Sequence, residues 1–149
     1  MSAVKALIPG TCAVILVITA GALVQAADDP ALVRAARTGD SKAVAALIQE
    51  KADVNAVAID GTTPLHWAVR ADDIETVDAL IRAGAQVKTA SRHGVTPLYL
   101  AADLGNVAMI RRLVAAGGDA NGTDISGDTV LMAAVRSGSI DAVRALLDE

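Results

Sequence analysis

The chain contains the heptapeptide Thr63-Pro64-Leu65-His66-Trp67-Ala68-Val69, and two related heptapeptides follow it at equal intervals. They are Thr96-Pro97-Leu98-Tyr99-Leu100-Ala101-Ala102 and Thr129-Val130-Leu131-Met132-Ala133-Ala134-Val135. Each of these two starts 33 residues after the copy before it. A repeat of this length indicates a stack of small helical units rather than one globular core, and such stacks usually act by offering a surface. We therefore expect a binding module.

The residue types at the start of each copy predict a short helix. Thr63 can accept backbone N–H groups as an N-cap, and Pro64 suits the first helical position, where no N–H is needed. Leu65, Ala68 and Val69 then share one face, because they are spaced at i, i+3 and i+4. The second copy repeats this start with Thr96, Pro97 and Leu98.

A second helix follows in each copy, and both of its ends are recognisable. Its start is expected after a capping side chain, which is Asp73, Asn106 or Ser139. Gly84 and Gly117 end it by adopting the left-handed conformation at low cost. An earlier copy begins near Pro30, and there Lys51 occupies the glycine position. A left-handed Lys51 would cost about 1–2 kcal/mol.

These motifs resemble the ankyrin-repeat family. The resemblance rests on the Thr-Pro-Leu-His-x-Ala frame at 63–68, Ala83-Gly84-Ala85, Gly105-Asn106, Asp53-Val54-Asn55, and the glycines Gly61, Gly94 and Gly127. It implies an all-α solenoid of about four repeats with β-finger loops, approximately at 30–62, 63–95, 96–128 and 129–149. The last repeat is incomplete, so it is either a short natural cap or the product of a truncated gene. The resemblance also implies that His66 joins hydrogen bonds between neighbouring loops, and we expect Trp67 to pack in the core.

The same resemblance implies where a partner would bind, namely the finger tips and the concave side of the first helices. The finger positions are Ile59, Asp60 and Thr62, then Arg92, His93 and Val95, then Ile125, Ser126 and Asp128. The helix positions are Arg37, Arg70, Asp103 and Arg136. Three arginines among four equivalent positions suggest a basic ladder that could engage one extended acidic partner. The alternative is a solvated charged face.

Composition narrows the class of protein. Hydrophobic residues make up 53% of the 149 residues, but aromatic residues make up only 1%, so Ala, Leu and Val must fill the core. A net charge of −4 and a pI near 5.0 argue against a nucleic-acid-binding protein, which needs a basic stripe. We expect a monomer whose partner is another protein.

Residues 1–26 differ in character from everything after them. Lys5 precedes a chargeless apolar run, and Val24-Gln25-Ala26 resembles the recognition site of a signal peptidase. We predict a bacterial signal peptide cleaved between Ala26 and Ala27, which leaves a mature domain of residues 27–149 in the periplasm. The alternatives are an uncleaved membrane anchor and a buried cytosolic helix. The only cysteine, Cys12, lies in this segment, so the mature chain would contain none.

No pattern in the chain indicates catalysis or metal binding. With two histidines and no mature cysteine, a tetrahedral metal site is not expected. Asp119–Asp124 hints at a calcium loop but lacks the glycine at its sixth position. No phosphate-cradling, dinucleotide or nucleophile motif occurs, so we predict no catalytic residues and no cofactor.

The sequence thus predicts a non-catalytic protein–protein interaction module in the bacterial periplasm. Two other functions remain as alternatives. A membrane-anchored scaffold would result if the N-terminal segment is not cleaved. A small hydrolase or metal-dependent enzyme is the competitor from another class.

Overall fold

The computed structural model describes residues 29–148, which form eight α-helices. Their bounds are α2 (Ala31–Thr38), α3 (Ser41–Gln49), α4 (Pro64–Arg70), α5 (Ile74–Arg82), α6 (Pro97–Asp103), α7 (Val107–Ala115), α8 (Val130–Ser137) and α9 (Ile140–Leu147). Within this range there is no β-strand, only an isolated bridge between Thr123 and Thr129. None of these helices combines the length and the apolar character that a membrane span requires. The predicted signal peptide at 1–26 lies outside the described residues.

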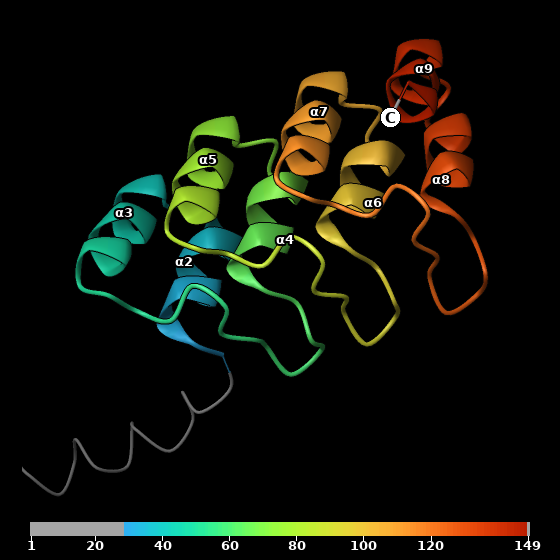
Figure 1. Ribbon diagram of the computed structural model, residues 1–149. Coiled ribbons are helices and arrows are strands. Elements are labelled where there is room, and N and C mark those ends of the chain that lie inside the picture. Colours follow the sequence, from blue (N-terminus) through green and yellow to red (C-terminus); the bar gives the residue numbers. More distant parts are fainter. Residues whose placement is uncertain (1–28, 149) are drawn as a thin grey trace, which may run out of the picture.

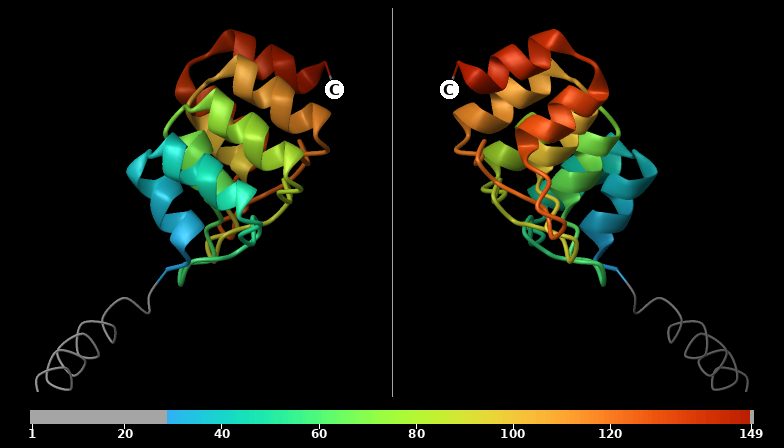
Figure 2. Two further views of the ribbon diagram at one scale, coloured as in Figure 1. Left: turned by 90° about the vertical axis from the view of Figure 1, so that its left-hand side faces the viewer. Right: turned by 90° about the vertical axis from the view of Figure 1, so that its right-hand side faces the viewer.

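The helices form two parallel rows. Helices α2, α4, α6 and α8 make one row, and α3, α5, α7 and α9 make the other (Figure 1). Each helix of the first row contacts the next one in that row and its own partner in the second row. The loops that connect successive pairs project from one side of the stack (Figure 2). The prediction of an all-α solenoid is therefore confirmed.

Side-chain caps explain where the helices begin. Thr96 and Thr129 each accept the backbone N–H three residues later, in Tyr99 and Met132, with N···O distances of 3.2 and 3.1 Å. These bonds satisfy donors that the first helical turn leaves without a partner. The second helix of each pair also begins after a capping side chain. Asp73, Asn106 and Ser139 have this role as predicted, and Asp40 caps the second helix of the first pair.

Left-handed residues explain where the helices end. Gly84 and Gly117 both have φ of 95°, as predicted. Lys51 stands at the equivalent place with φ of 59°, so the first repeat does carry a strained non-glycine residue there. Asp72, which follows α4, also has a positive φ of 57°, which we did not expect from its residue type. Its carboxylate accepts a hydrogen bond from the side chain of Asn106 in the next repeat, and this contact holds the residue in place.

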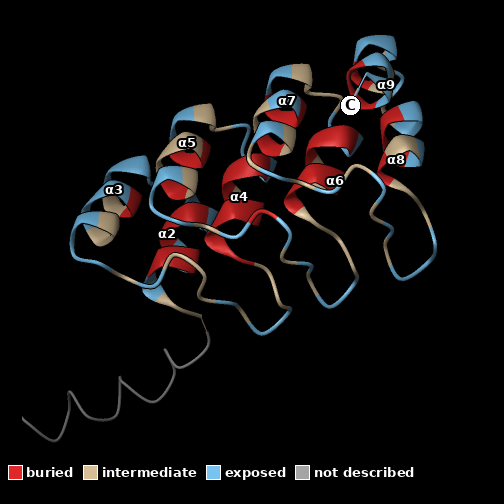
Figure 3. Cartoon of the chain, in the orientation of Figure 1, coloured by how far each residue is buried: buried red, intermediate tan, exposed pale blue. Residues whose placement is uncertain are grey.

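The core runs along the stack between the two rows (Figure 3). Small and medium aliphatic side chains dominate it, and among the Phe, Trp and Tyr residues described only Tyr99 is buried. This agrees with the composition, because thin helices with many alanines can approach closely. The largest side chains that are completely buried are Leu32, Leu65, Leu80, Leu98, Met109, Ile110 and Leu113.

The last helix pair has one apolar side without cover among the described residues. Met132 is 54% exposed and Val135 is 62% exposed. The equivalent residues one repeat earlier, Tyr99 and Ala102, are 7% and 0% exposed, because α8 covers them. The difference shows that burial in this fold depends on the neighbouring repeat more than on residue type.

Candidate interaction surface

Three hairpin-like turns, which we call fingers 1, 2 and 3, project beside the first row of helices. They span residues 58–62, 91–95 and 124–128. In finger 1 the N–H of Ala58 donates to the carbonyl of Thr62 (2.8 Å), and the N–H of Gly61 donates to that of Ala58 (2.9 Å). Fingers 2 and 3 repeat both hydrogen bonds at the equivalent residues. The three tips therefore share one backbone conformation.

Neighbouring fingers are also bonded to one another. The N–H of Arg92 donates to the carbonyl of Asp60 (2.9 Å), and the N–H of Ile125 donates to that of His93 (3.1 Å). Glycine permits this approach, since a Cβ on Gly61 would lie 2.9 Å from the Arg92 nitrogen and one on Gly94 would lie 2.7 Å from the Ile125 nitrogen. The finger tips form a coupled row whose backbone is largely preorganised.

His66 ties helix α4 to finger 2. The backbone N–H of Thr63 donates to Nδ1 of His66 (3.1 Å), so the ring hydrogen lies on Nε2, which donates to the carbonyl of Val95 (3.0 Å). Burial lowers the pKa of His66, although the Val95 carbonyl and the charge of Asp60 act in the other direction. A neutral, buried imidazole with both nitrogens engaged is a structural element rather than a catalytic base.

Most of the finger residues predicted to meet a partner are exposed. Ile59 is 63% exposed at the tip of finger 1, and Ile125 is 71% exposed at the tip of finger 3. At Asp60, the hydroxyl and the N–H of Thr62 donate to the carboxylate and lower its pKa, so it remains ionised at neutral pH. Arg92, His93 and Ser126 are exposed as well, whereas the predicted finger residues Thr62, Val95 and Asp128 are partly buried.

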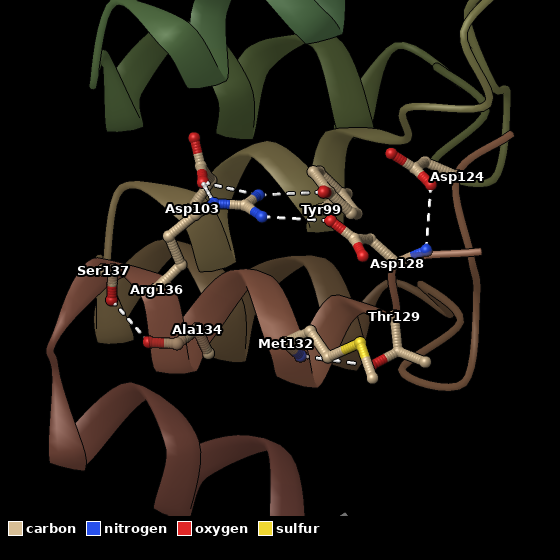
Figure 4. A network of polar contacts seen from close by, with 9 residues as sticks. All are labelled: Tyr99, Asp103, Asp124, Asp128, Thr129, Met132, Ala134, Arg136 and Ser137. Carbon is tan, nitrogen blue, oxygen red and sulfur yellow. Dashed lines mark hydrogen bonds and ion pairs between the residues drawn. The ribbon is translucent and has the colours of Figure 1, made fainter. Parts of the chain in front are cut away.

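The predicted helix positions Arg37, Arg70, Asp103 and Arg136 are also exposed, but they do not form a continuous basic ladder. Arg136 forms ion pairs with Asp103 (3.0 Å) and Asp128 (3.1 Å), and it donates to the hydroxyl of Tyr99 (2.9 Å) (Figure 4). The Tyr99 hydroxyl and these two carboxylates raise the pKa of Arg136. The charge of Arg136 is therefore already balanced within the stack at this end of the predicted ladder.

The opposite end of the surface is arranged around Trp67. The guanidinium carbon of Arg37 lies 5.9 Å from the centroid of its ring, and that of Arg70 lies 5.8 Å away. Both distances suit cation–π contact. Trp67 also donates from Nε1 to Oγ1 of Thr62 (3.0 Å), while Arg37 pairs with Asp29 (2.5 Å). Within residues 29–148, Arg70 makes no ion pair.

Trp67 is thus only in part the core residue that we expected. Its side chain packs against the core on one side but remains half-buried and reaches the surface. The spacing of Trp67, Arg37 and Arg70 in the sequence already indicates that these side chains lie together, and we call them the Trp67 cluster. Arg70 is three residues after Trp67 on the same helix, and Arg37 is 33 residues before Arg70, so the three side chains share one face of adjacent repeats.

Two shallow pockets flank this cluster and share Trp67 and Asp60. The smaller measures about 50 Å³ and is lined by Asp60, Thr62, His66, Trp67, Arg70 and Leu100. The larger measures about 240 Å³ and is lined by Asp29, Arg37, Ala58, Ile59, Asp60 and Trp67. Both are small for a cofactor or drug-sized ligand but suit individual side chains of a bound chain.

The part of the chain that the structure describes contains no group of three or more His, Cys, Asp or Glu residues able to hold a metal ion. In the segment that hints at a calcium loop, Asp119 accepts the N–H of Asn121, and Asp124 accepts those of Ser126 and Asp128. These carboxylates therefore stabilise the turns in which they lie.

The comparison with known proteins agrees with this architecture. A sequence model of the family described as "Ankyrin repeats (3 copies)" matches residues 1–91 and 73–149, which together span the chain. No curated protein matches the chain. The repeated helix pairs, the bonded fingers and the family match lead to one conclusion: the chain belongs to the ankyrin-repeat family.

Proposed function

We propose that this protein binds another protein through the exposed side of α2, α4, α6 and α8 together with fingers 1 to 3, and that it does so in the bacterial periplasm. Ankyrin repeats are in general protein–protein interaction modules, and a stack of repeats presents an extended surface of this kind. We call the proposed binding surface the inner surface. No catalytic step forms part of the proposal.

One observation carries the proposal: exposed apolar and aromatic side chains stand on a backbone that is already ordered. Ile59 protrudes from finger 1, and Trp67 lies beside it between two arginines. Tryptophan and arginine are the residues most enriched at energetic hot spots of protein interfaces. Because hydrogen bonds already hold fingers 1 and 2 together, binding would order little additional backbone.

The location is proposed from the sequence of residues 1–26. If this segment is a cleaved signal peptide, the protein isolated from the cell envelope begins at Ala27. Determining its N-terminal residue tests this directly. A chain that retains residues 1–26 and fractionates with membranes would instead support the alternative of a membrane-anchored scaffold.

Paired surface variants test the inner surface. Ile59→Ser combined with Ile125→Ser removes two exposed tips of the fingers. Ile140→Ser combined with Leu147→Ser removes two equally exposed apolar side chains from α9, away from the fingers. Each protein is immobilised and used to capture partners from periplasmic extract. All four substitutions are at exposed sites, so each should change stability by less than about 0.5 kcal/mol.

We expect the finger variant to lose the partner that the parent protein captures, while the α9 variant keeps it. If both variants capture the partner equally well, the inner surface is wrongly assigned. If only the α9 variant loses it, the partner binds at the end of the stack instead.

A further inference from the structure

We propose that the inner surface is divided into two halves and that the half around Trp67 binds an extended acidic peptide segment of the partner. This inference rests on the proposed function and specifies the chemistry of the partner. It starts from the contrast between Arg70, which has no ion pair among residues 29–148, and Arg136, which has two.

The charges on the inner surface are unevenly distributed. Arg136 is the one arginine at the α8 end, where it meets Asp103 and Asp128. The Trp67 end carries more arginines than aspartates. Its exposed arginines are Arg37, Arg70, Arg92 and also Arg34, whose position on α2 corresponds to that of Trp67 on α4 one repeat later. The aspartates beside them are Asp29 and Asp60.

The two arginines beside Trp67 are ready to bind carboxylates. A guanidinium group has five N–H donors, and Arg37 uses one nitrogen, Nη1, for Asp29. Within the described residues, Arg70 donates to no group. Since both lie within cation–π distance of the indole ring, binding restricts their side chains less than it would restrict free arginines. A peptide carboxylate could therefore pair with Arg70 directly and compete with Asp29 for Arg37.

The pocket next to Arg70 supplies an apolar contact and an acceptor. Trp67 and Leu100 line it together with Asp60, and about 50 Å³ is room for a small apolar side chain at most. Oδ1 of Asp60 accepts both donors of Thr62, whereas Oδ2 accepts no hydrogen bond from the described residues. An extended peptide has backbone N–H groups to offer at this position. The site thus matches a segment in which acidic residues flank one apolar residue.

Trp67 is the only tryptophan of the chain, so its fluorescence reports on this site alone. The probe is a synthetic octapeptide with blocked ends, in which glutamates flank one alanine. The matched control carries glutamines in place of the glutamates. We expect the glutamate peptide to change the Trp67 emission saturably and the glutamine peptide to bind at least about tenfold more weakly. Raising the salt concentration from about 0.05 M to about 0.3 M should weaken glutamate-peptide binding, because salt screens exposed charges.

Variants assign the binding to one half of the surface. Arg37→Ser combined with Arg70→Ser should raise the Kd of the glutamate peptide at least about tenfold, since two charge-assisted contacts are lost. Arg136→Ser, in the other half, should leave the Kd within about twofold. Arg82→Ser combined with Arg111→Ser removes the same number of exposed arginines from α5 and α7 and serves as the matched control. The Kd is taken from the titration midpoint, because the substitutions next to Trp67 also alter the emission amplitude.

The following results of the peptide titrations would overturn the inference. They are failure of the glutamate peptide to bind, equal binding of the two peptides, and a larger effect of Arg136→Ser than of the Arg37 and Arg70 double variant. Trp67 emission that depends on protein concentration without peptide would also overturn it, because a second copy would then cover the site. If the finger variants lose capture while the peptide does not bind, the proposed function stands and only the acidic partner is wrong.

Discussion

Nε2 of His66 lies 3.0 Å from the carbonyl oxygen of Val95, so a buried side chain on α4 holds the base of finger 2 at the end of the same repeat. Nδ1 accepts the N–H of Thr63 in the same arrangement, and it can do so only while it carries no hydrogen. If the imidazole were protonated, Nδ1 would become a donor and would face the N–H of Thr63, which is also a donor. The shape of the inner surface is therefore linked to the charge of one residue.

This link predicts that the stability depends on pH. The pKa of His66 is lowered in the folded protein, mainly by burial, from its ordinary value of 6.5. The unfolded chain therefore binds the proton more readily, and the free energy of unfolding falls as the pH drops below about 6.5. One such group can contribute a slope of at most about 1.4 kcal/mol per pH unit.

Chemical denaturation between pH 7.5 and pH 5 measures this slope, with His66→Gln as the comparison. The variant keeps His93, so a pH dependence shared by both proteins does not come from His66. Asp60, whose pKa is lowered below 3.8 by its bonds to Thr62, loses its contribution only at lower pH. Equal slopes in the two proteins between pH 7.5 and pH 5 would refute the assignment.

A glycine substitution tests the contact between fingers. Gly94→Ala places a Cβ 2.7 Å from the Ile125 nitrogen, and Gly94 also has a positive φ of 74°. We expect a loss of at least about 2 kcal/mol in the free energy of unfolding, from backbone strain together with the displaced finger. Gly127→Ala is the matched control, since Gly127 has φ of 85° but no atom within 4 Å of the added Cβ. It should cost only about 1 kcal/mol. Equal losses would show that the fingers separate easily.

The left-handed residue Lys51 offers a stabilising substitution. Lys51→Gly should raise the free energy of unfolding by about 0.5–1 kcal/mol, because glycine adopts φ near 59° without strain. Asp72→Gly relieves a similar strain but also removes the acceptor for Asn106, so its gain should be smaller or absent. Thermal unfolding of both variants distinguishes the two effects. A destabilised Lys51→Gly protein would contradict the explanation by backbone strain.

Equivalent positions in different repeats should respond differently to the same substitution. Val69 on α4 is completely buried, whereas Val135 on α8 is largely exposed. Val69→Ser should lower the free energy of unfolding by about 2–4 kcal/mol, since it leaves a cavity and buries a hydroxyl. Val135→Ser should change it by less than about 0.5 kcal/mol. Similar losses at both positions, measured by denaturant unfolding, would mean that something covers α8 in solution.

The candidate site could be predicted only in part. The 33-residue register identified exposed positions at the finger tips and on the first helices, because the register fixes which residues face outward, but it did not single out Arg34, Met132 or Val135. It did not reveal that Arg136 is neutralised by Asp103 and Asp128, or that Trp67 reaches the surface between two arginines. Both facts depend on which side-chain conformers meet across adjacent repeats, and residue spacing does not specify conformers.

The sequence by itself determined the architecture, because capping residues, helix-ending glycines and apolar spacing act within one repeat and recur at a constant interval. Lys51 shows this at a single residue, since its left-handed conformation follows from its place in the repeat. Only the tertiary structure decided how the repeats differ in their environment. Val69 and Val135 have the same side chain and occupy equivalent positions in their repeats. The following repeat covers Val69, whereas none of the described residues covers Val135 in this way. Burial and charge pairing arise from contacts between repeats, so only the structure of the stacked repeats defines them.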